Sequence, residues 1–305
     1  MPMHNAMFRS LSQLVRGCLA GMSLFLCCFS NSLGSVDVCQ QPAAHSHLSI
    51  AYYDHEKSSL ERGIGKAKQE NYDFDLQFRL SDNWTVGAGH RYTILNIVPL
   101  ELQTNGHLHT FFVPLHRQSQ SDRKGFRLSI APALSASSNV MGDFGEYNSD
   151  AFQLLAALVW SRQLSDRVIL RYGVCGDHRF GNYEIYPSVS VDLQPNADWT
   201  IKLGFPTSQL AYQVSTSFAS SLRITPDGNE WHVKDKSLEM QSQAVYEAWL
   251  LEWAVIWQVH KHLMVTAAVG RQFENKYEMT LLNEDRVKFR GDPVTRLGVA
   301  LAWRF

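Results

Sequence analysis

The sequence predicts an all-β fold, a transmembrane antiparallel up-and-down β-barrel of about 14 strands, with about 12 as the alternative. Three observations support this prediction. Apolar and polar residues alternate from about residue 45 onward, tight polar turns alternate with longer polar stretches, and the chain ends in an alternating segment whose last residue is Phe305. The first two observations are typical of barrels in a bacterial outer membrane.

The alternation is clearest between residues 72 and 80, where Tyr72, Phe74 and Leu76 are separated by Asp73 and Asp75. Because successive side chains on a strand point to opposite faces, such a run has one apolar and one polar face. The runs last about ten residues, the length of a tilted strand that crosses a bilayer. We expect strand centres near residues 50, 75, 88, 111, 130, 156, 171, 188, 201, 211, 221, 251, 267 and 299.

One segment fits two structures. Trp249, Trp253 and Trp257 recur at a spacing that suits either a strand face or a helix face. We favour a strand, because Leu251 and Val255 complete the alternation and the neighbouring segments are strands.

The connections between the runs are of two kinds. Short turn signals lie at residues 80–84, 164–168, 194–199 and 259–263. Wider polar connections are expected at residues 54–69, 137–149, 226–240 and 274–292. Short turns at the periplasmic end and long loops at the extracellular end are typical of outer-membrane barrels.

The apolar face needs a cover, and lipid is the cover that we predict, with a soluble β-sandwich as the less favoured alternative. Tryptophans near the tight turns are the expected interfacial aromatics: Trp84, Trp160, Trp199 and Trp257. Charges of both signs are expected to face the lumen: Asp73, Asp75, Arg79, Arg91, Arg127, Arg171, Glu184, Asp192, Arg223 and Glu252. These charges either pair across a narrow lumen or line a small water-filled pore, and their mixed signs slightly favour a constriction. We see no cluster of one sign that would predict a solute.

The N-terminus resembles a secretory signal peptide, which divides the chain into residues 1–34 and a barrel of residues 35–305. Arg9 and Arg16 precede an apolar stretch, residues 17–29, which is too short to span a bilayer. Three of the five cysteines lie in this leader. Cys39 and Cys175 remain, and they form at most one bridge; we favour an unbonded pair.

The C-terminus is the most specific feature of the chain. Leu297, Val299, Leu301 and Trp303 stand at every second position before Phe305. This ending resembles the β-signal of bacterial outer-membrane barrels, which implies an assembly signal formed by Arg296, Gly298, Val299, Leu301, Trp303 and Phe305. The resemblance implies export to the outer membrane of a Gram-negative bacterium. The implied partners are the secretory translocon, periplasmic chaperones, the barrel-assembly machinery, and outer-membrane lipid and lipopolysaccharide.

Residues 143–233 also resemble a family of uncharacterised Gram-negative barrels, domain of unknown function 6268. The similar features are Tyr186-Pro187-Ser188-Val189, Asp198-Trp199-Thr200-Ile201, and Leu203-Gly204-Phe205-Pro206-Thr207 followed by Leu210-Ala211-Tyr212. This family implies the fold and no activity or catalytic residue.

Composition and motifs narrow the function. The 305 residues are 45% hydrophobic with a net charge of −1, so no basic footprint predicts nucleic-acid binding. No hydrolase or phosphate-binding motif occurs, and the pairs His45/His47, His107/His109 and His260/His262 lack a third metal ligand. We therefore expect no catalytic residue and no cofactor. The leading hypothesis is a passive channel for small solutes; the alternatives are a non-conducting barrel that binds or scaffolds through its outer loops and, third, a membrane-embedded lipid hydrolase.

Overall fold

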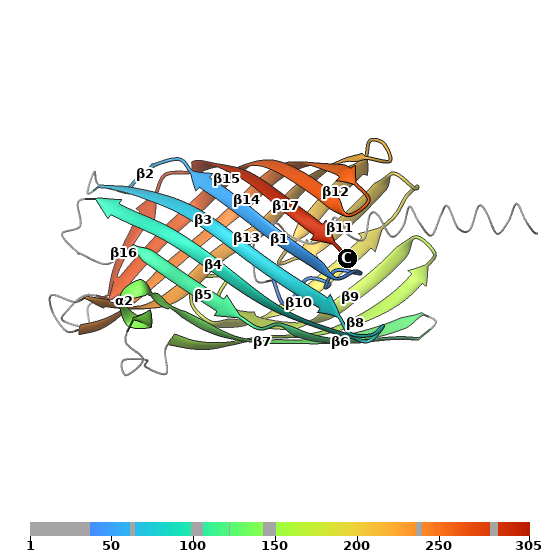
Figure 1. Cartoon of the computed structure of the whole chain (residues 1–305), viewed down its shortest axis with the longest axis horizontal. Coiled ribbons are helices and arrows are strands. Elements are labelled where there is room, and N and C mark those ends of the chain that lie inside the picture. Colours follow the sequence, from blue (N-terminus) through green and yellow to red (C-terminus); the bar gives the residue numbers. More distant parts are fainter. Residues whose placement is uncertain are drawn as a thin grey trace, which may run out of the picture.

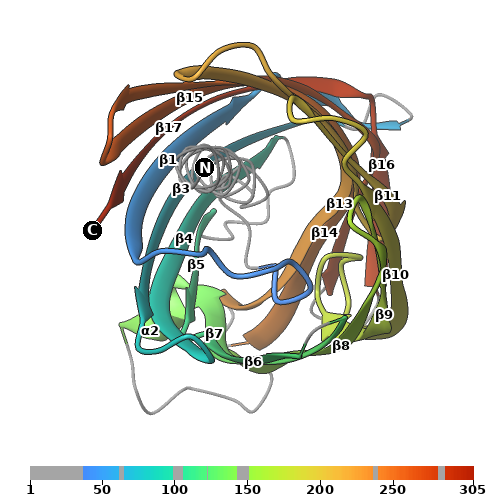
Figure 2. The same ribbon diagram turned by 90° about the vertical axis from the view of Figure 1, so that its right-hand side faces the viewer.

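The computed structural model describes residues 37–61, 65–98, 106–121, 123–142, 151–235, 240–280 and 286–305. These residues form one closed sheet (Figures 1 and 2). The strands of its first half are β1 (His47–His55), β2 (Ser58–Ser59), β3 (Lys66–Arg79), β4 (Trp84–Val98), β5 (His107–Phe112), β6 (Leu115–Ser121), β7 (Lys124–Ser137) and β8 (Phe152–Ser165). Those of its second half are β9 (Val168–Asp177), β10 (Glu184–Leu193), β11 (Trp199–Phe205), β12 (Ser208–Gln213), β13 (Phe218–Asp235), β14 (Met240–His260), β15 (Leu263–Thr280), β16 (Arg286–Gly291) and β17 (Val294–Arg304). A short helix, α2 (Ser138–Met141), follows β7.

The wall has fourteen spans. Of the 17 strands, β2 continues β1, β6 continues β5, and β16 leads into β17. Neighbouring spans are antiparallel, and β17 closes the wall by pairing with both β15 and β1. In the parts of the chain that the structure describes, no helix is long and apolar enough to cross a membrane.

The predicted strand pattern is confirmed. Each of the fourteen expected centres lies within a strand of a different span, and the four expected tight turns separate strands at one end of the wall. The tryptophan-rich segment is strand β14, as favoured. The predicted extent of three long connections is wrong. Residues 58–59 form β2 and β3 begins at Lys66, β13 continues to Asp235, and residues 286–291 form β16. Hydrogen bonds between strands stabilise these extensions, and their Trp231, Val233 and Phe289 are buried at the loop end.

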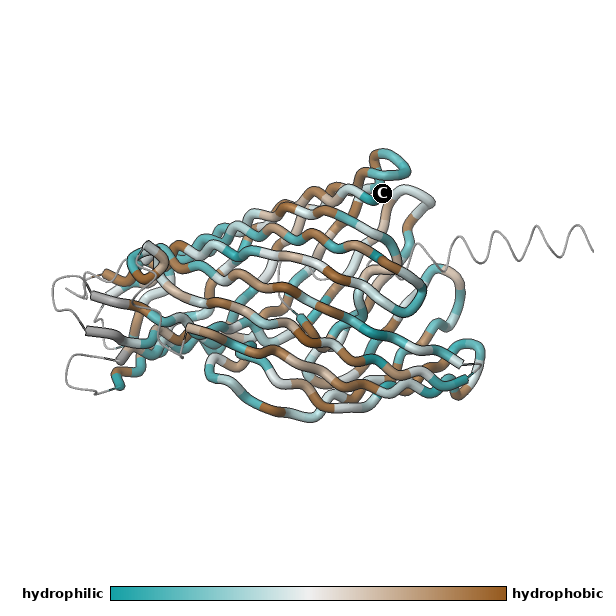
Figure 3. Tube along the Cα trace, turned by 60° about the horizontal axis from the view of Figure 1, so that its bottom comes forward, coloured by the Kyte–Doolittle hydropathy of each residue, from teal (hydrophilic) through white to brown (hydrophobic). Residues whose placement is uncertain are grey.

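The outer face of the wall is apolar. On β3, Tyr72, Phe74 and Phe78 are exposed, whereas Asn71 and Asp73 are buried. Hydrophobic and hydrophilic residues alternate along the strands in the same way across the wall (Figure 3). Exposed apolar side chains on nearly every span exceed what a protein surrounded by water presents, so this face suits hydrocarbon.

The wall is uneven in height. Strands β9 to β12 end early at the loop end, and β13 extends beyond its partner β12. There β13 meets β7 through the parallel bridge His232–Ala136, and the Ser135 hydroxyl donates to the carbonyl of Glu230 over 2.7 Å. The barrel is therefore pinched at its loop end. A packed core fills this narrow part: Leu60, Ala67, Leu95, Leu108, Trp231, Val233, Ala244, Tyr246, Ala248, Tyr277 and Phe289.

Candidate functional site: the closed lumen

A network of buried ion pairs crosses the middle of the lumen. Arg91 on β4 pairs with Asp73 on the neighbouring strand, at 2.9 Å from Nε to Oδ1, and approaches Asp227 on β13 at 3.9 Å. Arg296 on β17 also pairs with Asp227, at 3.3 Å, and with Glu252 on β14. We call Asp73, Arg91, Arg223, Asp227, Glu252 and Arg296 the central network. Its three cations and three anions neutralise one another.

Polar and aromatic side chains hold the central network in place. Gln272 donates to Asp227 over 2.9 Å and accepts from the ring of His55 over 2.7 Å. The guanidinium of Arg296 lies 4.4 Å from the centroid of the Tyr53 ring. That ring takes the space above Gly298, where an added Cβ would meet Tyr53 Cδ1 at 2.5 Å. Gly298 therefore makes room for the stack that orients Arg296.

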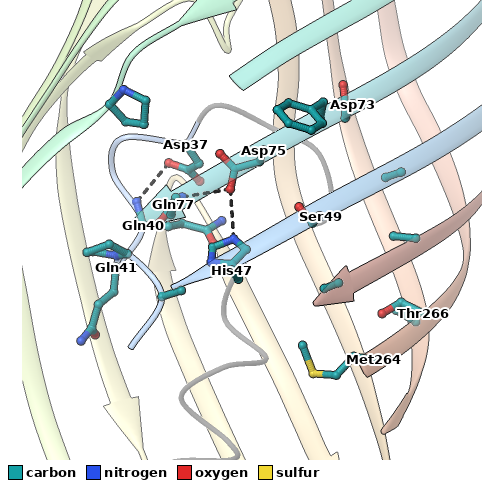
Figure 4. A pocket seen from close by; sticks show the side chains of 18 of the residues that line it. Asp37, Gln40, Gln41, His47, Ser49, Asp73, Asp75, Gln77, Met264 and Thr266 are labelled. Atoms are coloured by element: carbon teal, nitrogen blue, oxygen red, sulfur yellow. Dashed lines mark hydrogen bonds and ion pairs between the residues drawn. The ribbon is translucent and has the colours of Figure 1, made fainter. Parts of the chain in front are cut away.

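A cavity of about 160 Å³ lies inside the wall on the side of the tight turns. Asp73, Arg91 and Glu252 of the central network border it, and apolar side chains such as Ile256 and Met264 line much of the remainder. Figure 4 shows Asp75 between two of its partners: it accepts from Gln77 over 3.1 Å and contacts the ring of His47 at 3.0 Å. The lumen thus holds open space between the central network and the turn end.

Residues 37–46, the N-terminal segment, fold into the lumen and cover the turn end of this cavity (Figure 2). Val38 is buried in a cluster with Leu155 and Tyr186 of the wall. At the other end of the segment, Arg79 donates to the carbonyl of Ala44 over 2.6 Å. The segment therefore acts as a plug.

A disulfide joins the N-terminal segment to the wall, between Cys39 and Cys175 of β9. Our expectation of an unbonded pair is wrong. The sequence does not predict this disulfide, because the two cysteines are 136 positions apart and only the inward course of the segment brings them together. Both cysteines are buried.

The loop between β9 and β10 provides a second anchor. Arg179 pairs with Asp37 of the segment over 2.5 Å and with Asp177 over 3.0 Å, and it donates to the Tyr186 hydroxyl over 2.6 Å. Asp37, Cys39 and Asp177 lie close enough together to suggest a metal site. The donor set does not fit a metal, because Cys39 is bonded to Cys175 and both carboxylates pair with Arg179.

The predicted lumen residues fall into three groups. Asp73, Arg91, Arg223 and Glu252 belong to the central network. Asp75, Arg127, Arg171 and Asp192 lie on the inner face nearer the turn end, where Arg171 pairs with Asp192. Arg79 and Glu184 are exposed at strand ends, Arg79 beside Asp82 at the turn end and Glu184 as the first residue of β10.

The other predicted positions lie on the outer face or near the turns. Trp84, Trp160 and Trp257 are exposed, and Trp199 is half-buried against Tyr212. On the last strand, Val299, Leu301 and Trp303 are exposed and Phe305 contacts Phe78, whereas Arg296 is buried inside. The three histidine pairs lie in different parts of the wall. His47 contacts Asp75, His109 stacks on His90, and His262 contacts both His260 and Trp303.

Sequence reasoning missed four functional residues. Asp227 lies within residues 226–240, whose polar sequence predicts a connection and not a strand. Asp37, Cys39 and Arg179 lie outside the alternating runs, so no periodicity marks them. A buried arginine with two carboxylate partners from distant segments is visible only in three dimensions.

A closed antiparallel wall with an apolar outer face and a charged interior defines a transmembrane β-barrel of the outer-membrane type.

No family model and no curated protein matches the chain. Solved barrels are similar at low identity. An outer membrane channel from Pseudomonas putida F1 is 9% identical with a TM-score of 0.46, covering 90% of this chain and 100% of its own. The KdgM porin in complex with oligogalacturonate is 8% identical (TM-score 0.41, 84% and 99% covered), and the Pseudomonas putida toluene transporter TodX is 12% identical (0.40, 90% and 95%). Chains this different need not share a solute.

Proposed function

We propose that this protein is an outer-membrane channel for small solutes, closed in the conformation described here. The observation that supports this function is the cavity of about 160 Å³ inside the wall, bounded by non-covalently paired side chains and by the N-terminal segment. At one end lies the central network of ion pairs, and at the other a peptide segment that one disulfide and a few polar contacts hold. Charged groups that pair across a lumen close it in one conformation and line a polar path in another.

The proposed location is the outer membrane of a Gram-negative bacterium, reached through a cleaved signal peptide. The apolar outer face supports contact with lipid and lipopolysaccharide. Residues 1–34, the predicted leader, lie outside the described residues. The resemblance of residues 143–233 to domain of unknown function 6268 belongs to this proposal, and it adds no activity.

Planar-bilayer recording tests the channel. For the wild-type protein we expect brief and rare current steps, because the central network, the N-terminal segment and the packed core at the loop end must all open. The double variant C39S/C175S removes the covalent tether of the N-terminal segment and leaves only its non-covalent contacts with the wall. Loss of only about 1.4 kcal/mol of tethering raises the open fraction about tenfold, so the variant should conduct for a visibly larger share of the time.

Heat-modifiable migration on a gel serves as the control that the variant is folded. Silence of both proteins at every voltage, with folded barrels in the bilayer, would remove the channel.

A second candidate, a non-conducting barrel that binds or scaffolds through its outer loops, is favoured by the core at the loop end. Trp231, Leu108 and Phe289 pack in the pinched part of the lumen, and they lack the charged groups of the central network. Such packing resists the passage of water. The same recording distinguishes the two functions, because this barrel stays silent after the disulfide is removed.

The proposed assembly signal gives a separate prediction. Deletion of Phe305, or replacement of Trp303 and Leu301 with aspartate, should abolish insertion, because the machinery adds this strand to its own edge and reads its outward apolar side chains. Outer-membrane fractions should lack the heat-modifiable protein. Ala302→Asp is the matched control on the opposite face of the strand, and normal levels of the Trp303/Leu301 variant would disprove the signal.

A further inference from the structure

A row of cations lies on the wall beneath the N-terminal segment. Arg127 on β7, Arg171 on β9 and Lys202 on β11 each occupy the fourth position of a strand that starts at the turn end. Alternate strands of an antiparallel wall run in the same direction, so the three residues lie at a similar depth. We call them the cationic row.

The cationic row has few acidic partners. Arg171 pairs with Asp192 of β10. Within the described part of the chain, no ion pair involves Arg127 or Lys202. Arg127 is 8% exposed, and its buried Nε has no hydrogen-bond partner. A buried charged group without a full set of partners is unfavourable, so a hydrogen-bond acceptor placed beside the Arg127 guanidinium is stabilised.

The N-terminal segment offers oxygen acceptors to this wall. Arg127 Nη2 donates to the carbonyl of Cys39 over 2.5 Å, and Arg171 Nη2 donates to Oε1 of Gln41 over 3.2 Å. Asp37 adds a carboxylate, and its charge acts on both Lys202 and Arg127. Carbonyl, amide and carboxylate oxygens are also what an acidic solute would present.

We propose that the cationic row is a binding site for small solutes that carry carboxylate groups. In the closed conformation, the oxygen atoms of the N-terminal segment occupy this site in place of the solute. The inference rests on the proposed channel in one respect: the N-terminal segment must move away from the cationic row before a solute can bind there. Fixed rings of arginine and lysine select anions in pores. The row lies near the turn end, so a solute meets it after leaving the middle of the lumen.

The first test measures selectivity. In a KCl gradient, C39S/C175S should show a reversal potential that favours chloride, and adding R127Q/K202Q should abolish this preference. R162Q/R167Q, added to C39S/C175S instead, is the matched control: it removes the same charge from exposed positions near the turn end. It should leave the preference in place.

The second test measures binding without conduction, with succinate as the probe at constant ionic strength. Succinate should raise the thermal unfolding midpoint of C39S/C175S, as expected when a ligand binds the folded state, and should not raise that of the R127Q/K202Q form. D37N, which keeps the disulfide, serves if C39S/C175S does not fold, and should show a smaller rise. Current steps without anion preference, together with no succinate shift, would disprove the proposed binding site but would still support the proposed channel. A succinate shift that depends on Arg127 and Lys202, in a protein that never conducts, would support the site and remove the channel.

Discussion

Replacing Arg296 with methionine is expected to destabilise the barrel by about 3–5 kcal/mol, the cost of breaking a buried ion pair on one side. Arg296 is 5% exposed and binds Asp227 and Glu252 together. Its removal leaves Glu252 with Arg223 and leaves Asp227 with the distant Arg91. Urea titration of the protein refolded in lipid vesicles measures the loss without the assembly machinery.

Arg271→Met is the matched control on the neighbouring strand. Arg271 lies on the outer side, half exposed, and its contact with Glu56 spans 3.9 Å. An exposed pair of this kind contributes about 0–1 kcal/mol. Equal losses for the two variants would show that the central network does not stabilise the barrel. An increased single-channel conductance of the Arg296→Met variant would indicate that the central network also closes the lumen.

The second large effect is expected on the outer face. Leu76→Arg should cost about 2–4 kcal/mol, because a charged side chain near the midplane of a bilayer must be taken out of water. Leu76 points outward between Leu48 of β1 and Ala88 of β4. The same urea titration in vesicles gives the magnitude.

The neighbouring position supplies the control. Gln77 points inward, lines the cavity and donates to Asp75. Gln77→Arg places its charge beside that carboxylate, so it should cost much less than the change at Leu76. Similar costs at both positions would mean that the inward and outward faces of β3 are assigned wrongly.

The wall could be predicted from the sequence because apolar and polar residues alternate along membrane-spanning strands. Asp73 and Phe74 differ in polarity because one faces the lumen and the other faces lipid, and this requirement recurs at every second residue. The centres of all fourteen spans follow from it. The extension of β13 beyond Thr225 lacks this lipid-facing alternation, because its buried Trp231 and Val233 stand among polar residues and hydrogen bonds to β14 hold it in the sheet.

The interior of the barrel could be predicted only in part. Alternation identifies Arg91 and Glu252 as inward-facing, but it does not say whether they pair across the lumen, which depends on the width and pinching of the wall. The contacts of Asp37 and Cys39 depend on a segment that has no regular structure. Distant partners such as Asp37 and Arg179 meet because the chain closes on itself, and closure is not a local property.

The disulfide constrains the order in which the protein matures. A thiol-oxidising enzyme has to bring its own cysteine into contact with Cys39 or Cys175. In the finished barrel both lie buried inside the wall, against Val38 and Tyr186. Oxidation by such an enzyme is therefore expected before β17 meets β1, on a chain that is still open. The N-terminal segment is then already held against β9 when the wall closes.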